Sequence, residues 1–382
     1  MGTDPLVLVL GAGPAGLATA AELLARAVPV TVLERGDRPG AAWTGRYDAL
    51  RFNTSRRRSA LPGAPFPREY GQFPTRDQYV AYLQRYAADH GVPVETGVEV
   101  TRVRPDDDGW CVSTSAGDRH ARHVVVATGA LNRPKLPSWA VGSTFRGEVL
   151  HSSAYRSPAP FAGRTVVVAG RTVVVAGAGT SGMEIAHQLV TGGAARVLLA
   201  VRTPPNILLR ELHGVPGDLP VPLLLRLPDP LVDRLLFALQ RRTVGDLSAY
   251  GLPRPTEGAM AAIRARGVTP AIVDQVVLDE IRAGAIECVP AVVGLDGADV
   301  VLAGGRREPA DAVIAATGYR TGLEELVGGL GVLDEHGMPR DGAGRELVPG
   351  LRFVGYVHRP GLTGYVGKIA RRVAREIAAA GS

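Results

Sequence analysis

The chain is poor in cysteine, with only Cys111 and Cys288 among its 382 residues. Because the two lie far apart and neither belongs to a CxxC pair, the sequence disfavours reductases that work through a redox-active thiol pair. Two distant cysteines also argue against a disulfide-stabilised scaffold and are typical of a reducing compartment. We therefore expect chemistry that does not depend on the chain's own thiols.

Long apolar runs are also missing, and aromatic and charged residues are few. No stretch approaches the roughly 20 apolar residues of a membrane span, and no signal peptide is visible. We therefore expect no membrane span and a cytoplasmic location. Charged residues make up 21% and aromatic residues 5% of the chain, which is typical of an α/β protein with buried parallel strands. The length suggests two or three domains.

Neither the charge nor the polar residues point to nucleic acid, metal or acid–base chemistry. The net charge is +6, but the basic residues are scattered rather than arranged in a stripe, so we expect no nucleic-acid partner. A solvated surface or attraction of anionic cofactors accounts for the excess. The acidic run at 106–108 precedes a glycine and is typical of a turn. The sequence contains no pattern of a catalytic triad, a metal cluster or a carboxylate pair.

A glycine-rich fingerprint, by contrast, is present twice, as GAGPAG at 11–16 and as GAGTSG at 177–182. Each copy follows an apolar run and opens a helix-like segment. The glycines permit a tight turn and a close approach of backbone to a pyrophosphate, which then lies on the helix N-terminus. We therefore predict two dinucleotide sites, which include Gly11, Gly13, Pro14, Ala15 and Gly16 in one and Gly177, Gly179, Thr180, Ser181 and Gly182 in the other.

The two copies differ at the end of the strand that follows each of them. After the first copy this strand runs into Glu34, an acid placed to accept hydrogen bonds from a ribose diol, and then Arg35. After the second copy it runs into Arg202, a cation suited to a 2′-phosphate, with Thr203 as a second donor. Ordinary surface roles are the alternatives for both charged residues. We assign the first site to FAD and the second to NADPH.

The order of these units predicts an α/β fold with two Rossmann-like, three-layer dinucleotide-binding domains. The NADPH-binding domain, about 163–308, is inserted in a discontinuous FAD-binding domain, about 1–160 and 310–382. A Leu- and Pro-rich insert, about 204–275, interrupts the NADPH-binding domain. We expect this insert to form core or a subunit contact, as in a homodimer. The alternative is the lining of an apolar substrate channel.

Apolar spacing predicts some individual elements. Tyr79, Tyr82 and Tyr86 share a face of a helix over about 75–90. Strands are expected over 95–104 and 110–115, and the last helix over about 364–380.

The segment AGRTVVV occurs twice in direct succession, at 162–168 and at 169–175. One copy suffices for the strand that leads into Gly177. The other is either an extra extended segment between the domains or a duplication in the gene, and both explanations remain open.

Between the two fingerprints, residues 145–155 read FRGEVLHSSAY. This matches the FxGxxxHxxxY pattern of class B flavin monooxygenases, and the chain resembles the flavin-containing monooxygenases over nearly its full length. Within that group it is most similar to the YUCCA-type branch. The chain departs from the family in the distance between this motif and the second fingerprint, which lie closer together in the family. Phe145 and Gly177 are 32 positions apart, and removal of one AGRTVVV repeat would shorten this distance by seven. The closer likeness is carried by GTSGMEIA at 179–186, AVRT at 200–203, YGLPRP at 250–255, ATGYR at 316–320 and FVGYVHRPGLTG at 353–364.

The resemblance implies an FAD- and NADPH-dependent monooxygenase. Such an enzyme inserts one oxygen atom of O₂ into a small organic substrate through a flavin C4a-hydroperoxide. Oxygenation of nitrogen or sulfur, Baeyer–Villiger insertion and oxidative decarboxylation of a 2-oxo acid all remain open. The alternatives are a flavin-dependent NADPH reductase or dehydrogenase that passes electrons to a quinone or protein, and a non-enzymatic redox sensor.

The resemblance also implies roles for residues outside the fingerprints. It places Asn53 near flavin C4a, where it would help to hold the hydroperoxide, and Trp43 against the flavin; turn formation and core packing are the alternatives. It places Thr128 and Gly129 near the flavin, and Thr317 and Gly318 at a hinge between domains. The N-terminus of the last helix, near Gly364, could stabilise negative charge at flavin N1 through its dipole. His151 and Tyr155 are expected to couple domains rather than to perform chemistry.

Overall fold

The computed structural model describes residues 6–162 and 172–380, and the chain divides into two compact units. The first unit comprises Met1–Gly45, Leu50–Arg133 and Tyr319–Ser382, and the second comprises Arg46–Ala49 and Pro134–Gly318. These boundaries differ from the expected ones near 160 and 310. The reason is that strand β9 (Glu148–His151) pairs with β20 (Ala312–Ala315) inside the second unit.

The first unit is built on a six-stranded sheet whose central strands are buried and apolar. Strand β1 (Val7–Leu10) pairs in parallel with β2 (Val30–Glu34) on one side and with β7 (His123–Val126) on the other. All four residues of β1 and all four of β7 are buried, as expected for parallel strands covered on both faces. The order is β22-β23-β7-β1-β2-β3, where β22 is Ala343–Val348, β23 is Leu351–Val354 and β3 is Val94–Thr96.

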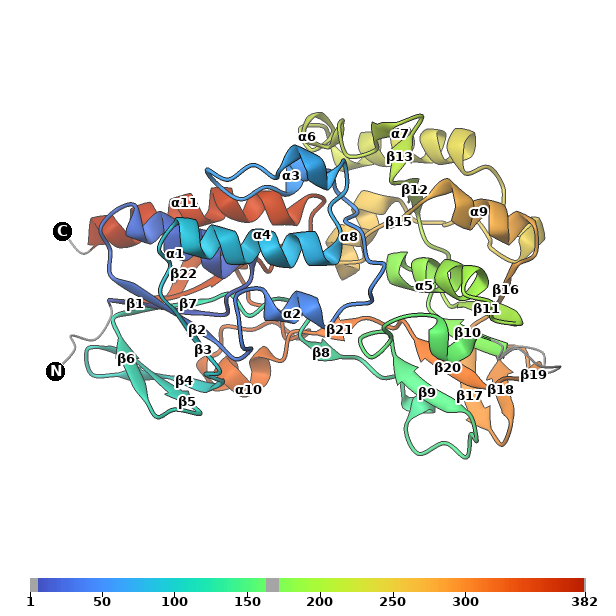
Figure 1. The fold of residues 1–382 in the computed structure, drawn as a ribbon, viewed down its shortest axis with the longest axis horizontal. Coiled ribbons are helices and arrows are strands. Elements are labelled where there is room, and N and C mark those ends of the chain that lie inside the picture. Colours follow the sequence, from blue (N-terminus) through green and yellow to red (C-terminus); the bar gives the residue numbers. More distant parts are fainter. Residues whose placement is uncertain (1–5, 163–171, 381–382) are drawn as a thin grey trace. The chain divides into compact units, whose positions relative to one another are not determined.

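Alternating residues of β1 point into two separate cores, which gives the unit three layers. Val7 and Val9 pack in one core, and Leu8 and Leu10 pack in the other. Figure 1 shows helices on one side of the sheet and a second, smaller sheet with a short helix on the other. The helices are α1 (Pro14–Leu24), α4 (Arg76–Asp89) and α11 (Leu362–Ala380); the opposite layer holds β4 (Val100–Asp106), β5 (Gly109–Thr114), β6 (Arg119–Ala121) and α10 (Leu323–Val327).

The element predictions for this unit are confirmed except for one strand. The helices expected over 75–90 and 364–380 are α4 and α11, and the strand expected over 110–115 is β5. The single strand expected over 95–104 is wrong, because β3 and β4 divide it between two sheets. Gly97, at φ +72°, allows the left-handed turn between them that other residues adopt less readily.

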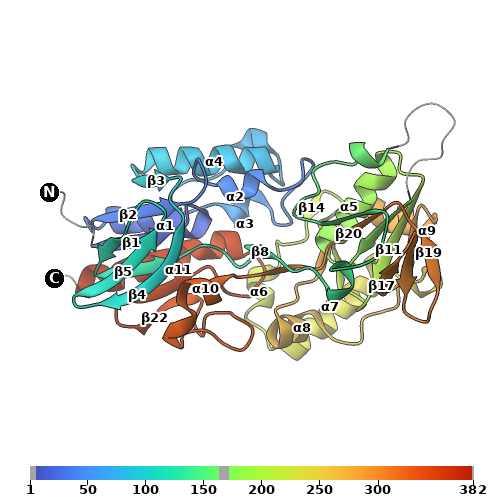
Figure 2. The same ribbon diagram turned by 90° about the horizontal axis from the view of Figure 1, so that it is seen from below.

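The second unit has a five-stranded parallel sheet in the order β16-β11-β10-β20-β9. Figure 2 shows this sheet with helices packed along it and β17 beside it. Both units are thus layered α/β structures, which confirms the predicted fold class. The further elements are β10 (Thr172–Ala176), β11 (Arg196–Val201), β16 (Ile286–Pro290), α5 (Thr180–Thr191), α9 (Gln275–Arg282), β17 (Val292–Asp296), β18 (Asp299–Leu302) and β19 (Arg307–Pro309).

The repeated AGRTVVV segment is described only in part. Apart from Ala162, the first copy lies outside the described residues, as do the first three residues of the second copy. The remaining TVVV of the second copy forms most of β10 and leads directly into the second fingerprint.

The Leu- and Pro-rich insert follows β11 in the chain and leads into α9. Its strands β12 (Ile207–Leu209) and β15 (Ala271–Val273) pair in parallel. Helix α7 (Asp229–Thr243) buries Val232 and Gln240 but leaves three leucines, four residues apart, more than 40% exposed. The insert is therefore only partly core, and a subunit contact through it stays a prediction. The exposed leucines are Leu231, Leu235 and Leu239, and the smaller helices of the insert are α6 (Val221–Leu224) and α8 (Ala259–Arg266).

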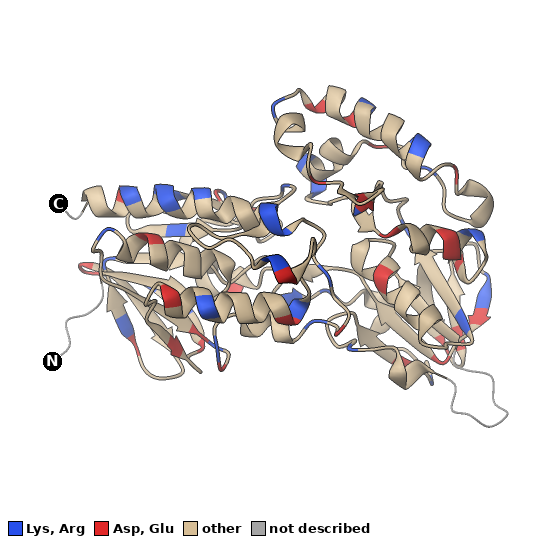
Figure 3. Cartoon of the chain, turned by 45° about the horizontal axis from the view of Figure 1, so that its top comes forward, with Lys and Arg blue, Asp and Glu red and all other residues tan. Residues whose placement is uncertain are grey.

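Acidic and basic residues are both scattered over each unit, as Figure 3 shows. This distribution matches the scattered charge seen in the sequence. No helix of the described residues combines the length and the apolar character needed to cross a membrane.

Candidate functional site

The first fingerprint forms the turn between β1 and α1, and its glycines serve different purposes. Gly11 has φ +102°, and a Cβ atom there would lie 2.9 Å from the Ala127 carbonyl oxygen; one at Gly16 would lie 1.9 Å from the Gly11 carbonyl oxygen. A Cβ atom at Gly13 would meet nothing within 4 Å. Gly11 and Gly16 are therefore required by packing, whereas Gly13 keeps the backbone open at the start of α1. This open backbone fits a pyrophosphate.

Glu34 is held at the rim of the same turn. It is the last residue of β2 and is buried. Its carboxylate accepts hydrogen bonds from the backbone nitrogen of Ala12, at 2.7 Å, and from that of Gly36, at 2.8 Å. Each carboxylate oxygen keeps acceptor capacity for a ribose hydroxyl. Arg35 is exposed and donates a hydrogen bond to Asn132 at 2.8 Å.

Thr128 and Gly129 follow β7 and lie beside the first fingerprint, because a Cβ atom at Gly11 would be 3.2 Å from the Cα of Thr128. The Thr128 hydroxyl is 2.8 Å from the Tyr356 hydroxyl. Gly129 has φ +87° and open space where a Cβ atom would be. The structure therefore brings this strand end together with Gly11, and its position near a bound flavin stays a prediction.

Trp43 packs against a buried aromatic residue, Phe52, and Asn53 is the next residue in the chain. Trp43, on α2 (Ala41–Thr44), packs against Phe52 with ring centroids 5.5 Å apart, and against Tyr79 at 4.8 Å. Asn53 directly follows Phe52 and is exposed. The Trp43 ring is therefore packed against the aromatic residues of the core, which was the alternative to packing against the flavin.

The start of α11 lies against the segment that follows Asn53. A Cβ atom at Gly364 would lie 2.0 Å from the carbonyl oxygen of Arg58, a residue of α3 (Arg56–Ser59). Gly364 is thus needed for this close approach between the two helices. The structure brings the first turn of α11 to the Asn53 segment, within one unit.

The second fingerprint repeats the geometry of the first. Gly177 has φ +122°, and a Cβ atom there would lie 2.5 Å from the Ala316 carbonyl oxygen. A Cβ atom at Gly182 would lie 1.8 Å from the Gly177 carbonyl oxygen, whereas one at Gly179 would meet nothing within 4 Å. The backbone at Gly179, at the start of α5, is therefore uncovered in the same way as the backbone at Gly13. Ser181 lies in the first turn of this helix.

Arg202 and Thr203 directly follow β11 and are exposed. Within the described part of the chain, no hydrogen bond or ion pair engages the Arg202 guanidinium. Its charge and its planar set of donors therefore fit a phosphate group.

Thr317 and Gly318 end the second unit and are fixed by His151. The Thr317 hydroxyl donates to the Lys135 carbonyl at 2.6 Å. The Gly318 carbonyl oxygen lies 2.9 Å from Nε2 of His151. Because a carbonyl oxygen can only accept a hydrogen bond, Nε2 carries the proton and donates. Nδ1 of His151 then accepts from the Ser153 backbone nitrogen at 3.1 Å. Burial lowers the pKa of His151, which keeps it neutral. These contacts agree with a positioning role rather than an acid–base role.

Sequence reasoning missed a buried polar cluster on α5. The Tyr47 hydroxyl donates to one carboxylate oxygen of Glu184, and Arg210 donates to the other. Nε of Arg210 also lies 3.3 Å from Asp274. Tyr47, Glu184 and Arg210 are buried, and burial raises the pKa of Glu184. The presence of Glu184 inside GTSGMEIA was the one signal in the sequence, and nothing pointed to its partners.

Comparison with known proteins identifies the family to which the chain belongs. The profile of the pyridine nucleotide-disulphide oxidoreductase family matches residues 8–207, which include both fingerprints. The chain is 36% identical to the indole-3-pyruvate monooxygenase YUCCA1 of Oryza sativa subsp. japonica, over 98% of this chain and 91% of that protein. It is 33% identical to the probable indole-3-pyruvate monooxygenase YUCCA8 of Arabidopsis thaliana, over 94% of this chain and 85% of that protein.

Solved structures agree in fold. The flavin-containing monooxygenase from Stenotrophomonas maltophilia matches with a TM-score of 0.75 and 26% identity over the full length of both chains. Cyclohexanone monooxygenase matches with a TM-score of 0.72 and 16% identity, over 100% of this chain and 88% of that one, which shows a common fold.

The chain's two cysteines are both free, and they belong to different sheets, Cys111 to the sheet of β5 and Cys288 to that of β16. The chain belongs to the pyridine nucleotide-disulphide oxidoreductase family and, within it, to the YUCCA-type flavin monooxygenases, enzymes that use FAD and NADPH.

Proposed function

We propose that this monooxygenase carries out the oxidative decarboxylation of an aryl-substituted 2-oxo acid. The observation that carries this proposal is the likeness, over nearly the whole chain, to indole-3-pyruvate monooxygenases. In the balanced reaction, the 2-oxo acid, O₂, NADPH and a proton give the carboxylic acid shortened by one carbon, CO₂, water and NADP⁺. One oxygen atom of O₂ enters the new carboxylate, and the other leaves as water.

The first unit would bind FAD. Gly13 leaves room for the pyrophosphate at the start of α1, and Glu34 would accept hydrogen bonds from the ribose hydroxyls. FAD, when bound, supplies the chemistry of accepting hydride from NADPH and reacting with O₂. Asn53 would contact the reactive edge of the flavin, and Trp43 would pack beside it.

The second unit would bind NADPH. Gly179 leaves room for its pyrophosphate at the start of α5, while Arg202 and Thr203 would hold its 2′-phosphate. His151 would keep Gly318 in place through its hydrogen bond to that carbonyl. The role of His151 is then to position the backbone at the end of the unit, not to move a proton.

The test is a substrate screen under ¹⁸O₂ with NADPH, in which indole-3-pyruvate, phenylpyruvate, cyclohexanone, thioanisole and N,N-dimethylaniline are compared. We expect the 2-oxo acids to stimulate NADPH oxidation and to give CO₂ and an acid carrying one ¹⁸O atom. If only the ketone, the sulfide or the amine is turned over and the 2-oxo acids are not, the proposal is wrong and the enzyme carries out a different oxygenation. NADPH oxidation linked to quinone reduction, with no ¹⁸O in any organic product, would favour the electron-transfer alternative.

A further inference from the structure

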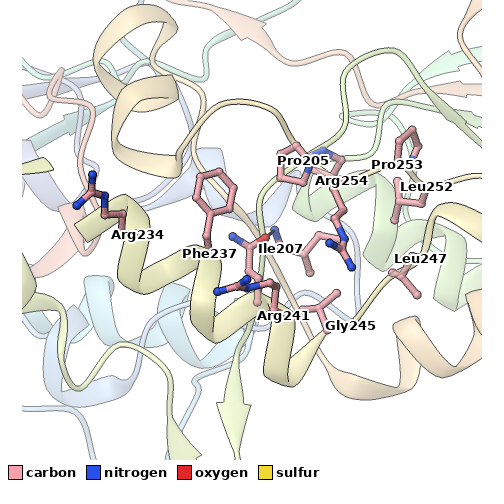
Figure 4. A pocket seen from close by; sticks show the side chains of 13 residues that line it. Pro205, Ile207, Arg234, Phe237, Arg241, Gly245, Leu247, Leu252, Pro253 and Arg254 are labelled. Carbon is pink, nitrogen blue, oxygen red and sulfur yellow. Dashed lines mark hydrogen bonds between the residues drawn. The ribbon is translucent and has the colours of Figure 1, made fainter. Parts of the chain in front are cut away.

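A cavity of about 440 Å³ lies inside the insert of the second unit (Figure 4). This volume lies within the range of small-molecule sites, roughly 300–1,000 Å³. Helix α7 forms one wall, and the segment 244–255 forms another. Apolar side chains dominate the lining, including Ile207, Phe237, Leu247 and Leu252. The cavity contains no part of either glycine fingerprint, so it is separate from the predicted pyrophosphate sites.

The charged residues of the lining are all arginines. Arg234 and Arg241 come from α7, Arg254 comes from the opposite wall, and none of the 13 lining residues is acidic. Arg234, Phe237 and Arg241 are spaced i, i+3 and i+7, so they share one face of α7. This face therefore presents an aromatic ring between two cations.

The positive charge of the cavity is only partly neutralised by the protein. Arg254 pairs with Asp246 at 3.0 Å, but both side chains are more than half exposed, and such pairs are weak. Among the described residues, no ion pair engages Arg234 or Arg241. An anionic ligand would therefore find arginine donors without having to displace a buried partner.

The chemistry of this lining defines its ligand. A bare inorganic anion would leave the apolar walls unused, and a neutral apolar molecule would desolvate arginines without pairing them. We propose that the cavity binds a small amphipathic carboxylate, with its flat apolar body on Phe237 and its carboxylate at Arg241 and Arg254. An arginine can hold a carboxylate by two parallel hydrogen bonds.

Two features connect this cavity to the rest of the enzyme. Four residues of the YGLPRP segment, Leu252 to Pro255, line it, and neither fingerprint uses this segment. Ile207 of β12 also lines it; β12 pairs with β15, and Ile272 of β15 donates to the Thr180 hydroxyl at 2.9 Å. The cavity is therefore linked to the start of α5 through these two strands, and any test must separate its ligand from NADPH.

The test measures binding of 2-naphthoate to the FAD-loaded protein by isothermal titration calorimetry, with saturating NADP⁺ present. Matched probes are 2-naphthamide, which has the same body without charge, and sulfate, which has charge without the body. We expect 2-naphthoate to bind at least about tenfold more tightly than either. The variants are Arg241→Gln and Phe237→Ala. The control is Arg242→Gln, which changes the neighbouring exposed arginine of α7 that lies outside the lining.

Arg241→Gln should weaken binding of 2-naphthoate about tenfold or more, and Phe237→Ala about threefold or more. Arg242→Gln should leave it unchanged, and flavin content and circular dichroism should be the same in all variants. Equal binding of 2-naphthamide, equal losses in Arg241→Gln and Arg242→Gln, or failure of 2-naphthoate to bind once NADP⁺ saturates the protein would overturn the proposal.

A substrate and a product of the enzyme could share the carboxylate chemistry. Competition of phenylpyruvate and of phenylacetate against 2-naphthoate identifies which of them the cavity prefers. The proposal does not rest on the proposed reaction, because binding is measured without turnover and is assigned to the cavity by the Arg241 and Arg242 variants.

Discussion

The hydroxyl of Tyr47 donates a hydrogen bond to the carboxylate of Glu184, although 137 positions separate the two residues. Glu184 lies on α5, which opens with the second fingerprint. Tyr47 belongs to Arg46–Ala49, a short excursion into the second unit by a chain that is otherwise in the first. The contact therefore fixes the short segment Arg46–Ala49, within the second unit, to the helix that carries the predicted NADPH site.

Replacement of Tyr47 by phenylalanine should destabilise the protein. The change removes a donor to a buried carboxylate, which costs about 1–3 kcal/mol when the group is left without its partner. We expect a fall in Tm of several degrees for a unit of this size, measured by thermal unfolding. Tyr250→Phe is the control, because Tyr250 is 42% exposed. Identical melting of the two variants would show that the Tyr47 contact contributes nothing to stability.

The glycines of the second fingerprint should separate into a packing class and a binding class. Gly177→Ala forces a methyl group toward the Ala316 carbonyl at positive φ, which should cost roughly 1–3 kcal/mol of stability. Gly179→Ala meets no protein atom, so the fold should persist while KM for NADPH rises about tenfold or more. Thermal unfolding and NADPH kinetics on both variants test this. Unchanged NADPH kinetics in Gly179→Ala would remove this backbone from the NADPH site.

The stability of the second unit should fall in mild acid because of His151. Burial, reinforced by Arg46, lowers the pKa of this imidazole in the folded protein, whereas in the unfolded chain it is near 6.5. The unfolded state then binds a proton first as the pH falls. The stability contributed by neutral His151 is present above pH 6.5 and is lost as the pH falls through the lower, folded pKa.

His151→Gln tests this by removing the titrating group. Thermal unfolding between pH 7.5 and 5 should show a smaller acid-induced loss for the variant than for the native chain. His123, whose pKa burial also lowers, remains in both proteins and sets the common background. Parallel pH profiles for the two proteins would contradict the assignment to His151.

The features that the sequence could predict are those formed by local geometry. Each fingerprint needs only a strand, a turn and a helix in succession, and the acid or arginine that follows lies at the end of the next strand. Sites whose residues come together only through tertiary contacts have no local sequence pattern that predicts them. The Glu184 cluster gathers Tyr47 and Arg210 from distant segments, and the cavity depends on how α7 packs against residues 244–255. The prediction of one strand over 95–104 was wrong because the spacing of hydrophobic residues does not reveal the turn at Gly97.

Arg202→Gln should abolish the preference for NADPH over NADH. The guanidinium is exposed and forms no ion pair among the described residues, so its loss should leave the fold intact. We expect KM for NADPH to rise about tenfold or more, as for loss of a charge-assisted phosphate contact, and KM for NADH to stay the same. NADH is the internal control, since it lacks the 2′-phosphate. An equal rise for both nucleotides would show that Arg202 does not read the 2′-phosphate.

Asn53→Ala should separate NADPH oxidation from product formation. Asn53 is exposed beside the buried Phe52, so truncation of its side chain should not disturb the Trp43, Phe52 and Tyr79 packing or the flavin content. If Asn53 contacts the reactive edge of the flavin, its loss should divert electrons from substrate to H₂O₂. We expect H₂O₂ released per NADPH consumed to rise severalfold, measured with a peroxidase assay at saturating 2-oxo acid. The packing control is Trp43→Phe, which should lower flavin content or stability instead. If the H₂O₂ released per NADPH consumed is the same in Asn53→Ala as in the native chain, Asn53 is an ordinary turn residue. The groups that contact the reactive edge of the flavin would then be the backbone around Gly129 and the first turn of α11.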